Sequence, residues 1–357
     1  MTRNLAASPL LVAFATVLAA SPARAQHAAS RRVDLDSTTI TLEGKVETLL
    51  STTSVPGERP TDFRLRRVYL GAVVRVDPLV SGKIQVDFAG EKASLKDAYV
   101  KLSFAPALQL LAGNAYRPFS RLALTSDTRM PPVERGVQIR GLEAMEEQDF
   151  VSALAYTERD VGFQLIGAPE AAPLGLRYAA GIFRGPVFDR VGGRNSFQYV
   201  ARLSAVVLPR LQVGAAWSSR DFVGDTVADE PRALKRGDAY EVDAEYGAFG
   251  PGFHALGEVA AGAAQPFTAT DFGGAAAWLA YRTRPLGAAV TGLEPTVRVG
   301  YGHLDAPLAG RGGTLVTPGL NLYLGARSRV MVNYDVWAAA DGGEAGRSFK
   351  LMFELVF

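Results

Sequence analysis

The chain ends in Ser348-Phe349-Lys350-Leu351-Met352-Phe353-Glu354-Leu355-Val356-Phe357, a stretch in which apolar residues occupy every second position. The residues between them include the charged Lys350 and Glu354. Because successive side chains of a β-strand point to opposite faces, this stretch predicts a strand with one apolar and one mixed face. In a soluble protein the apolar face would cover a core, whereas in a membrane barrel it contacts lipid and the polar face lines the lumen. For a barrel, we expect Lys350 and Glu354 to tolerate substitution and Phe353 and Leu355 to resist it.

Alternating segments of about ten residues recur from Thr38 to the end of the chain, separated by turn clusters. In 67–76 and 328–337, for example, apolar residues share one face. The pattern predicts an all-β fold, a transmembrane antiparallel β-barrel of about 16 strands, which is wide enough to enclose an aqueous channel. The expected strands are 38–52, 63–77, 80–90, 95–105, 107–116, 161–167, 174–184, 197–207, 210–220, 238–249, 252–262, 272–283, 294–304, 313–325, 327–338 and 347–357.

The connections between these strands fall into two classes. Short ones such as Asp77-Pro78 and Pro209-Arg210 alternate with longer polar ones, of which 117–148 is the longest. Short turns on one side and long loops on the other are typical of outer-membrane barrels. We therefore expect one barrel domain over 38–357, with a constriction loop at about 117–136 that folds inward.

Residues 1–25 have the features of a secretory signal peptide: a positively charged start, an apolar run over 10–20, and Ala23-Arg24-Ala25 as a cleavage pattern. The alternative, an N-terminal membrane helix, is disfavoured because this apolar run is too short to span roughly 30 Å of hydrocarbon. The mature chain would begin at Gln26 with a tail over 26–37. Export to the bacterial outer membrane is the expected localisation.

Composition excludes several classes of protein. The 357 residues include no cysteine, so disulfide frameworks and thiolate metal sites are excluded. Beyond residue 25 no apolar stretch approaches the length of a membrane-spanning helix. Without the two arginines of residues 1–25, the 38 basic residues fall to the number of acidic ones, 36. Any preference for anions must therefore come from where the charges lie.

Several motifs follow one another along the first half of the chain: Arg66-Arg67-Val68-Tyr69-Leu70-Gly71, Asp87-Phe88-Ala89-Gly90, Ser94-Leu95-Lys96-Asp97-Ala98-Tyr99, Arg117-Pro118-Phe119-Ser120, Leu124-Thr125-Ser126, Val133-Glu134-Arg135 and Tyr178-Ala179-Ala180-Gly181-Ile182-Phe183. Through the motifs in 66–136 the chain resembles the phosphate-selective porin family of O and P type, and 178–183 resembles a later strand of that family.

Membership would imply a sixteen-stranded homotrimeric porin with one pore per subunit, a loop folded into each pore, and a preference for anions or phosphate. A final strand ending on Phe357 also resembles the C-terminal signature that the barrel-assembly machinery reads. The chain departs from the family pattern at Tyr116-Arg117, where members often carry Lys-Glu. The lysine cluster and arginine ladder of the family cannot be placed here residue by residue.

Two sets of basic residues are the candidate pore-lining groups. The first, in the expected constriction loop, is Arg117, Arg121, Arg129 and Arg135, with Asp127 and Glu134 among them. Guanidinium groups at a narrow point favour anions, although an ordinary solvated external loop would explain the same residues. The second set is Arg67, Arg75, Lys83 and Lys101, on strands where Asp87 and Asp97 face the same way. This wall is either an anion track or a neutral lattice of salt bridges, and Glu241, Asp243 and Glu245 predict an acidic wall opposite.

Enzymatic motifs are missing from the sequence: it has neither a Gly-x-Ser-x-Gly elbow, nor His-Glu-x-x-His, nor a P-loop. The acidic stretch 221–230 lacks the spacing of a calcium loop and is interpreted as a solvated loop. We expect no enzymatic activity, cofactor, metal site or nucleic-acid partner. The expected partners are small anions such as phosphate, outer-membrane lipid and the assembly machinery.

The sequence thus predicts an outer-membrane porin, a passive diffusion channel for small solutes with a preference for anions or phosphate. Two alternatives remain open. One is a non-selective general porin, and the other is a non-conducting barrel that acts as an adhesin or surface structural protein.

Overall fold

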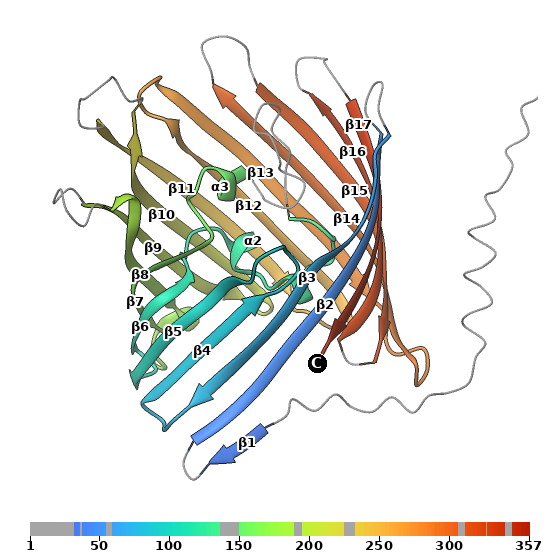
Figure 1. Ribbon diagram of the computed structural model, residues 1–357, viewed down its shortest axis with the longest axis horizontal. Coiled ribbons are helices and arrows are strands. Elements are labelled where there is room, and N and C mark those ends of the chain that lie inside the picture. The colour runs from blue at the N-terminus through green and yellow to red at the C-terminus, as the bar shows by residue number, and fades with distance from the viewer. Residues whose placement is uncertain are drawn as a thin grey trace, which may run out of the picture.

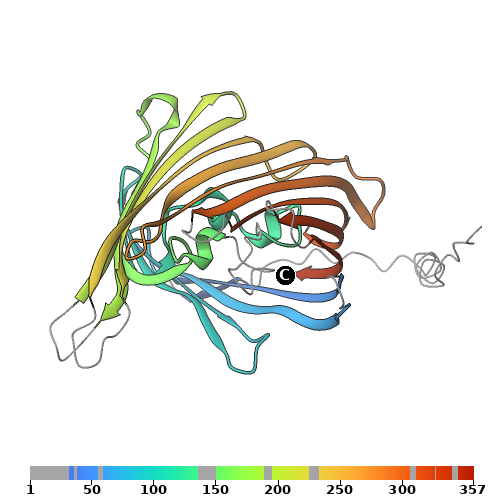
Figure 2. The same cartoon turned by 90° about the horizontal axis from the view of Figure 1, so that it is seen from above.

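The computed structural model describes residues 32–35, 38–54, 59–135, 150–188, 195–224, 233–305, 311–325, 327–339 and 345–357. Sixteen antiparallel strands, β2 to β17, form a closed barrel (Figures 1 and 2). Each strand pairs with the next, and β17 pairs with β2, with Phe353 opposite Thr48. None of the helices in the described part of the chain has the length and apolar character needed to cross a membrane. The predicted all-β barrel of 16 strands is confirmed.

The strand bounds agree with the expected ranges to within a few residues for most elements. The barrel strands are β2 (Thr38–Ser54), β3 (Thr61–Arg75), β4 (Val80–Asp87), β5 (Ser94–Ala105), β6 (Leu108–Tyr116), β7 (Arg159–Gly167), β8 (Arg177–Phe188), β9 (Asn195–Leu208), β10 (Leu211–Val223), β11 (Leu234–Gly247), β12 (Gly252–Gln265), β13 (Thr270–Arg282), β14 (Val290–Asp305), β15 (Arg311–Leu324), β16 (Ser328–Ala339) and β17 (Ala345–Val356).

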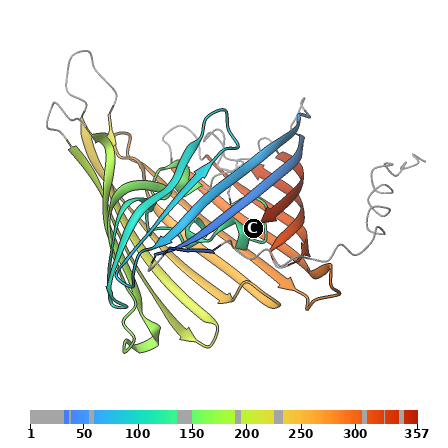
Figure 3. The ribbon, with the colours of Figure 1, turned by 60° about the horizontal axis from the view of Figure 1, so that its bottom comes forward.

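A further strand, β1 (Arg32–Leu35), pairs with the start of β2, with Val33 opposite Ile40. It lies within residues 26–37, which were expected to form a tail. The sequence did not predict this strand, because four residues are too few to produce a recognisable alternation. The expected signal peptide, residues 1–25, lies outside the described residues. Both β1 and the C-terminus are at the end of the barrel that carries the short turns (Figures 1 and 3).

The two faces of the wall differ as the alternation predicts. In β17, Phe353 on the outer face is 46% exposed, whereas Lys350 on the inner face is only 3% exposed. The outer face is apolar enough for lipid contact. The register expected for this strand is therefore confirmed, but its inner face is not an open water-lined surface.

The last residue also closes the wall. Phe357 exchanges two backbone hydrogen bonds with Gly44 of β2, at 2.9 and 3.0 Å. A Cβ atom at Gly44 would fall within 2.3 Å of the Phe357 ring. Glycine at this position therefore leaves room for the aromatic ring that ends the chain.

The described parts of the long connection between β6 and β7 lie inside the ring of strands when the barrel is seen from above (Figure 2). They contain the short helices α2 (Arg121–Leu124) and α3 (Phe150–Ala153) and the 3₁₀ turn η1 (Asp127–Arg129). The candidate site consists of the contacts that hold this connection in the lumen and of the open space beside it.

Candidate functional site: a lumen crossed by one loop

Residues 117–135, called the inner loop below, bridge opposite walls of the barrel. Arg121 forms an ion pair with Glu245 on β11. At the other end of the loop, Glu134 pairs with Arg66 on β3 at 2.7 Å. In a ring of sixteen strands, β3 and β11 are eight steps apart and therefore face each other across the lumen. The inner loop consequently spans the full width of the channel.

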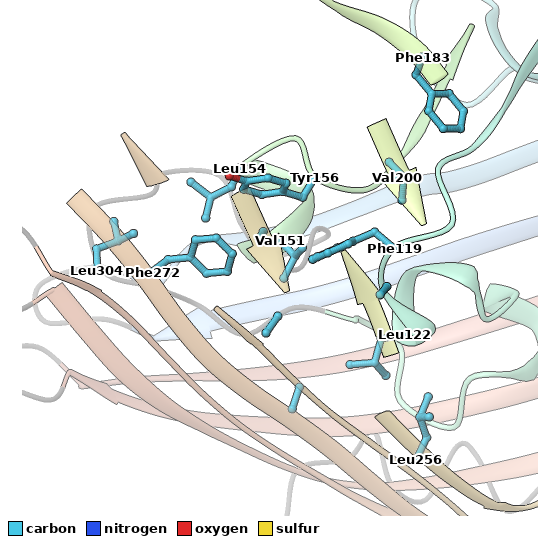
Figure 4. Close-up of a cluster of buried hydrophobic side chains, with 14 of the residues drawn as sticks. Phe119, Leu122, Val151, Leu154, Tyr156, Phe183, Val200, Leu256, Phe272 and Leu304 are labelled. Atoms are coloured by element: carbon cyan, nitrogen blue, oxygen red, sulfur yellow. The ribbon is translucent and has the colours of Figure 1, made fainter. Parts of the chain in front are cut away.

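On one wall, the connection is held by an apolar cluster inside the barrel (Figure 4). The Tyr156 ring packs on those of Phe119, Phe222 and Phe272, with ring centroids 5.6 to 6.2 Å apart. Its hydroxyl donates to the backbone carbonyl of Ala263 at 2.8 Å. Burying an aromatic side chain of this size stabilises a fold by about 1.5–3 kcal/mol. This wall therefore holds the base of the connection by hydrophobic packing.

The start of α2 is held by carboxylates of the same wall. The Ser120 side chain caps the helix by accepting from the backbone N–H of Ala123, and its hydroxyl contacts both oxygens of Glu258 at 2.8 Å. The backbone N–H of Leu122 donates to Glu258 at 2.9 Å, and that of Arg121 donates to Glu241 at 3.3 Å. Carboxylates are favourable at a helix start because the first N–H groups there lack partners within the helix.

The predicted acidic row on β11 faces the lumen, but its members are engaged. Arg202 of β9 pairs with Glu241 at 2.9 Å and with Asp243 at 2.5 Å. It also donates to the Phe119 carbonyl of the inner loop at 3.2 Å. Together with the Arg121–Glu245 pair, these contacts make the row an anchor for the loop and not an open acidic wall.

On the opposite wall, Arg66 is clamped between two carboxylates. It donates to Glu47 at 2.6 Å and to both oxygens of Glu134, at 2.7 and 3.2 Å. The side chains of Arg66 and Glu134 are each only 2% exposed. A β-bulge opposite Glu47 turns both Arg66 and Arg67 inward. Strict alternation would point Arg66 outward, so sequence reasoning did not include it among the site residues.

The backbone of the inner loop is satisfied by side chains of β14 to β16. Arg329 donates to the carbonyls of Asp127 and Met130, both at 2.7 Å. Asn333 accepts from the backbone N–H of Val133 at 2.6 Å, and Asn321 donates to the carbonyl of Pro131 at 2.8 Å. A buried loop without such partners would leave costly unpaired backbone groups. These strands therefore carry polar side chains that fit one conformation of the loop.

Three of the four predicted loop arginines are neutralised by carboxylates. Arg117 lies 3.7 Å from Asp160, Arg121 pairs with Glu245, and Arg135 pairs with Asp127. Burial of Arg117 disfavours its charged form and lowers its pKa to about 10.

The fourth loop arginine differs from the others. Arg129 is exposed, and within the described residues it has no ion-pair partner. It is therefore the one loop arginine whose charge is open to the lumen.

Asp127 is the centre of the charge network at the loop tip. Burial by itself would raise the pKa of its carboxyl, but the charges of Arg135, Arg67 and Lys45 outweigh that effect and hold the pKa well below its usual range. Lys45 and Arg67 each lie 3.2 Å from this carboxylate. Asp127 therefore carries its negative charge at any physiological pH.

The predicted basic wall is divided in the same way. Arg67 pairs with Asp127, and Lys83 lies 2.5 Å from Glu43 and 3.3 Å from Asp97. Arg75 and Lys101 have no ion-pair partner within the described residues. Arg67 and Lys83 thus belong to a lattice of salt bridges, whereas Arg75 and Lys101 do not.

Several basic residues of the lattice were not predicted as site residues. Each was missed because its partner lies on another strand or on the loop, which spacing along the chain does not reveal. They are Lys45, Arg66, Arg159, Arg202, Arg298 and Arg329. Of these, Arg159 contacts Asp97 at 2.6 Å and lies 4.0 Å from the centre of the Tyr116 ring.

Open space remains on both sides of the loop tip. One recess of about 420 Å³ lies against β9 to β12, and another of about 280 Å³ lies against β2 to β7. Both are lined by Leu124, Thr125 and Ser126, so the tip separates them. Among the described residues, no cluster of acidic or histidine side chains is arranged to hold a metal ion. Most of the acidic stretch 221–230 lies outside the described residues.

Comparison with known proteins agrees with this architecture. The chain is similar in structure to the outer-membrane channel DcaP of Acinetobacter baumannii, with a TM-score of 0.63 and 13% identity over 91% of this chain and 99% of that one. It is also similar to an anion-selective porin of Comamonas acidovorans (TM-score 0.60, 13% identity, 90% and 100% covered). A third similar structure is the trimer form of OmpT of Vibrio cholerae (TM-score 0.58, 13% identity, 90% and 100% covered).

At this identity, the structural likeness shows a shared fold. No curated protein sequence matches the chain. A family model does match, over residues 57–303, which is more than half of the chain. The resemblance noted in the sequence is therefore confirmed, and the chain belongs to the family described as phosphate-selective porin O and P.

Proposed function

We propose that the protein is a passive diffusion channel for small solutes, with a preference for anions that include phosphate. The observation that carries the proposal is the open space on both sides of the loop tip within a closed barrel. Solutes would move down their own gradient, with neither a covalent step nor a cofactor, and we propose no enzymatic activity.

The expected preference for anions is modest, because most lumen charges cancel in pairs. Paired charges such as Arg121 and Glu245 create little field a few ångströms away. Arg129 has no ion-pair partner among the described residues, and it raises the local concentration of anions from the inner loop. An anion-selective porin of the same fold and the family description both support this assignment. The alternative is a general porin, in which the excess of unpaired positive charge in the lumen is too small to make the channel selective for anions.

Planar bilayer recordings test the channel itself. Refolded protein should insert and give discrete conductance steps, and the reversal potential in a potassium chloride gradient should lie on the anion side. Added phosphate should lower the chloride current by competing for the same cations. Silence in repeated insertions of protein with barrel circular dichroism would overturn the channel, whereas a reversal potential near zero would identify a general porin.

We further propose export by residues 1–25, assembly in the bacterial outer membrane through recognition of Phe357, and a homotrimer. The outward, partly exposed Phe357 ring and the apolar outer face support membrane assembly. A trimer form of OmpT, which shares this fold, supports the oligomer. Crosslinking of detergent-extracted protein tests the trimer, and deletion of Phe357 should reduce outer-membrane assembly without affecting export.

A further inference from the structure

The recess of about 420 Å³ lies at the end of the barrel that carries the short turns. It is defined here by Leu124 and Arg129 of the inner loop and by Val206, Arg210, Phe249 and His254 of the wall, and is called the short-turn recess. Arg210 lies in the turn between β9 and β10, and Phe249 lies in the turn between β11 and β12. A solute that passes the loop tip on this side must enter it.

Among the described residues, the short-turn recess has no free carboxylate to compensate its positive charge. Its one carboxylate, Glu245, is already engaged by Arg121 and by His254, whose Nε2 lies 2.8 Å from the carboxylate. Arg129 and Arg210 are both exposed, and neither has an ion-pair partner within the described residues. Arg210 also donates to the Phe253 carbonyl at 3.3 Å, and its guanidinium lies 5.3 Å from the centre of the Tyr246 ring. Two guanidinium groups with no free carboxylate beside them among the described residues produce a positive potential that attracts anions.

Apolar surface lies beside these guanidinium groups. Val206 faces the lumen and is 42% exposed, and Leu124 and Phe249 also line the recess. Exposed apolar side chains next to fixed cations favour a ligand that has both an anionic group and an apolar body. The volume of the recess falls within the range of small-molecule sites, about 300–1,000 Å³. Inorganic phosphate could use the charge but not the apolar surface.

We propose that the short-turn recess is a binding site for small organic anions, with a carboxylate on Arg129 and Arg210 and an apolar frame on Leu124, Val206 and Phe249. The inference extends the proposed function, because it assumes that solutes reach the recess through the lumen. The inference adds small organic anions as a class of solute, for which the paired charges of the salt-bridge lattice provide no selectivity.

Benzoate is the probe for channel recordings, with acetate as the anion that lacks an apolar frame. Benzoate added on the short-turn side should block the chloride current at millimolar concentration, and acetate should block about tenfold less well. The double substitution R129Q/R210Q should weaken the benzoate block by about tenfold or more, since it removes both charged donors. Val206→Thr should weaken the block by benzoate but not that by acetate.

The matched control is R75Q/K101Q, which also removes two cations that have no ion-pair partner in the described part of the chain but leaves the short-turn recess unchanged. Its benzoate block should stay within about twofold of the wild type. Equal losses in both double variants would mean that only the overall field matters, and would overturn the site.

Calorimetric titration of benzoate into detergent-solubilised protein separates this inference from the proposed function. Binding that depends on Arg129 and Arg210 in a protein that gives no conductance would refute the channel and support the site. A conducting protein that shows neither benzoate block nor binding heat would refute the site and leave the channel intact.

Discussion

At the scale of single residues, the same side chain has opposite roles according to its partners. Arg66 is buried between Glu47 and Glu134, whereas Arg75, at the end of the same strand, is exposed and unpaired within the described residues. Removing one member of a buried pair leaves an uncompensated charge and costs several kcal/mol, whereas an exposed charge costs little. The residue type is the same in both cases, so the sequence does not distinguish them. The difference comes from whether a carboxylate lies next to the arginine in the folded chain.

We expect Arg66→Met to lower the free energy of unfolding by about 3–5 kcal/mol, because Glu47 and Glu134 would be left buried without their counter-charge. Arg75→Met should change it by less than about 0.5 kcal/mol. Urea unfolding in lipid vesicles, followed by tryptophan fluorescence, measures both. A similar loss in the two variants would contradict the clamp.

The second prediction at this scale concerns pH. Because the pKa of Asp127 is held below that of the unfolded chain, about 3.9, its stabilising effect is complete above that value. The effect is lost only as the pH falls through the lower folded value. The contribution of Asp127 to conductance and thermal stability should therefore stay constant from pH 8 to about pH 5.

Asp127→Asn should loosen the loop at every pH in that range, because Lys45, Arg67 and Arg135 lose their shared partner. Noisier single-channel currents at neutral pH are the expected readout. A wild-type channel that becomes equally noisy already between pH 7 and pH 6 would show that another group controls the loop.

At the scale of elements, alternation predicted most strands, because each wall residue chooses between lipid and lumen with a period of two. It failed where a local feature breaks the period, at the bulge that turns Arg66 inward, and for β1, which is too short to show a period. It also misjudged the inner face of β17. Lys350 and Glu354 were expected to tolerate substitution, but they are buried against Asp335 and Arg329.

In β17, substitutions on both faces should therefore be costly, for different reasons. Phe353→Arg should cost about 2–4 kcal/mol because it places a charge in lipid. Glu354→Gln should also destabilise the barrel by a few kcal/mol, because it leaves Arg329 buried without its carboxylate 2.7 Å away. Combining Glu354→Gln with Arg329→Met should not recover that loss, because Arg329 also donates to the carbonyls of Asp127 and Met130. Combining it with Phe353→Arg should not recover it either. Unfolding midpoints of the four variants test this.

At the scale of the whole molecule, the sequence predicted the barrel and the segment that crosses it, but not how that segment is held. The bond from Arg329 to the Asp127 carbonyl joins residues 202 positions apart, and no local pattern encodes such a partner. Arginines at 117, 121 and 135 were therefore assigned to solute contact, although in the folded chain each one neutralises a nearby carboxylate. Which arginine keeps an unneutralised charge therefore depends on contacts that form only in the folded barrel.

The last prediction follows from that distribution of charge. Arg129→Ala should shift the reversal potential toward cations at 0.1 M salt, because it removes from the inner loop a charge that has no ion-pair partner among the described residues. Arg117→Ala should shift it far less, since Arg117 is buried beside Asp160 and donates to Gln198. At 1 M salt the Debye length falls from about 10 to about 3 Å, so the effect of Arg129 should largely disappear. If both variants shift the potential equally, or if the shift persists at high salt, fixed charge on the inner loop does not set the selectivity of this channel.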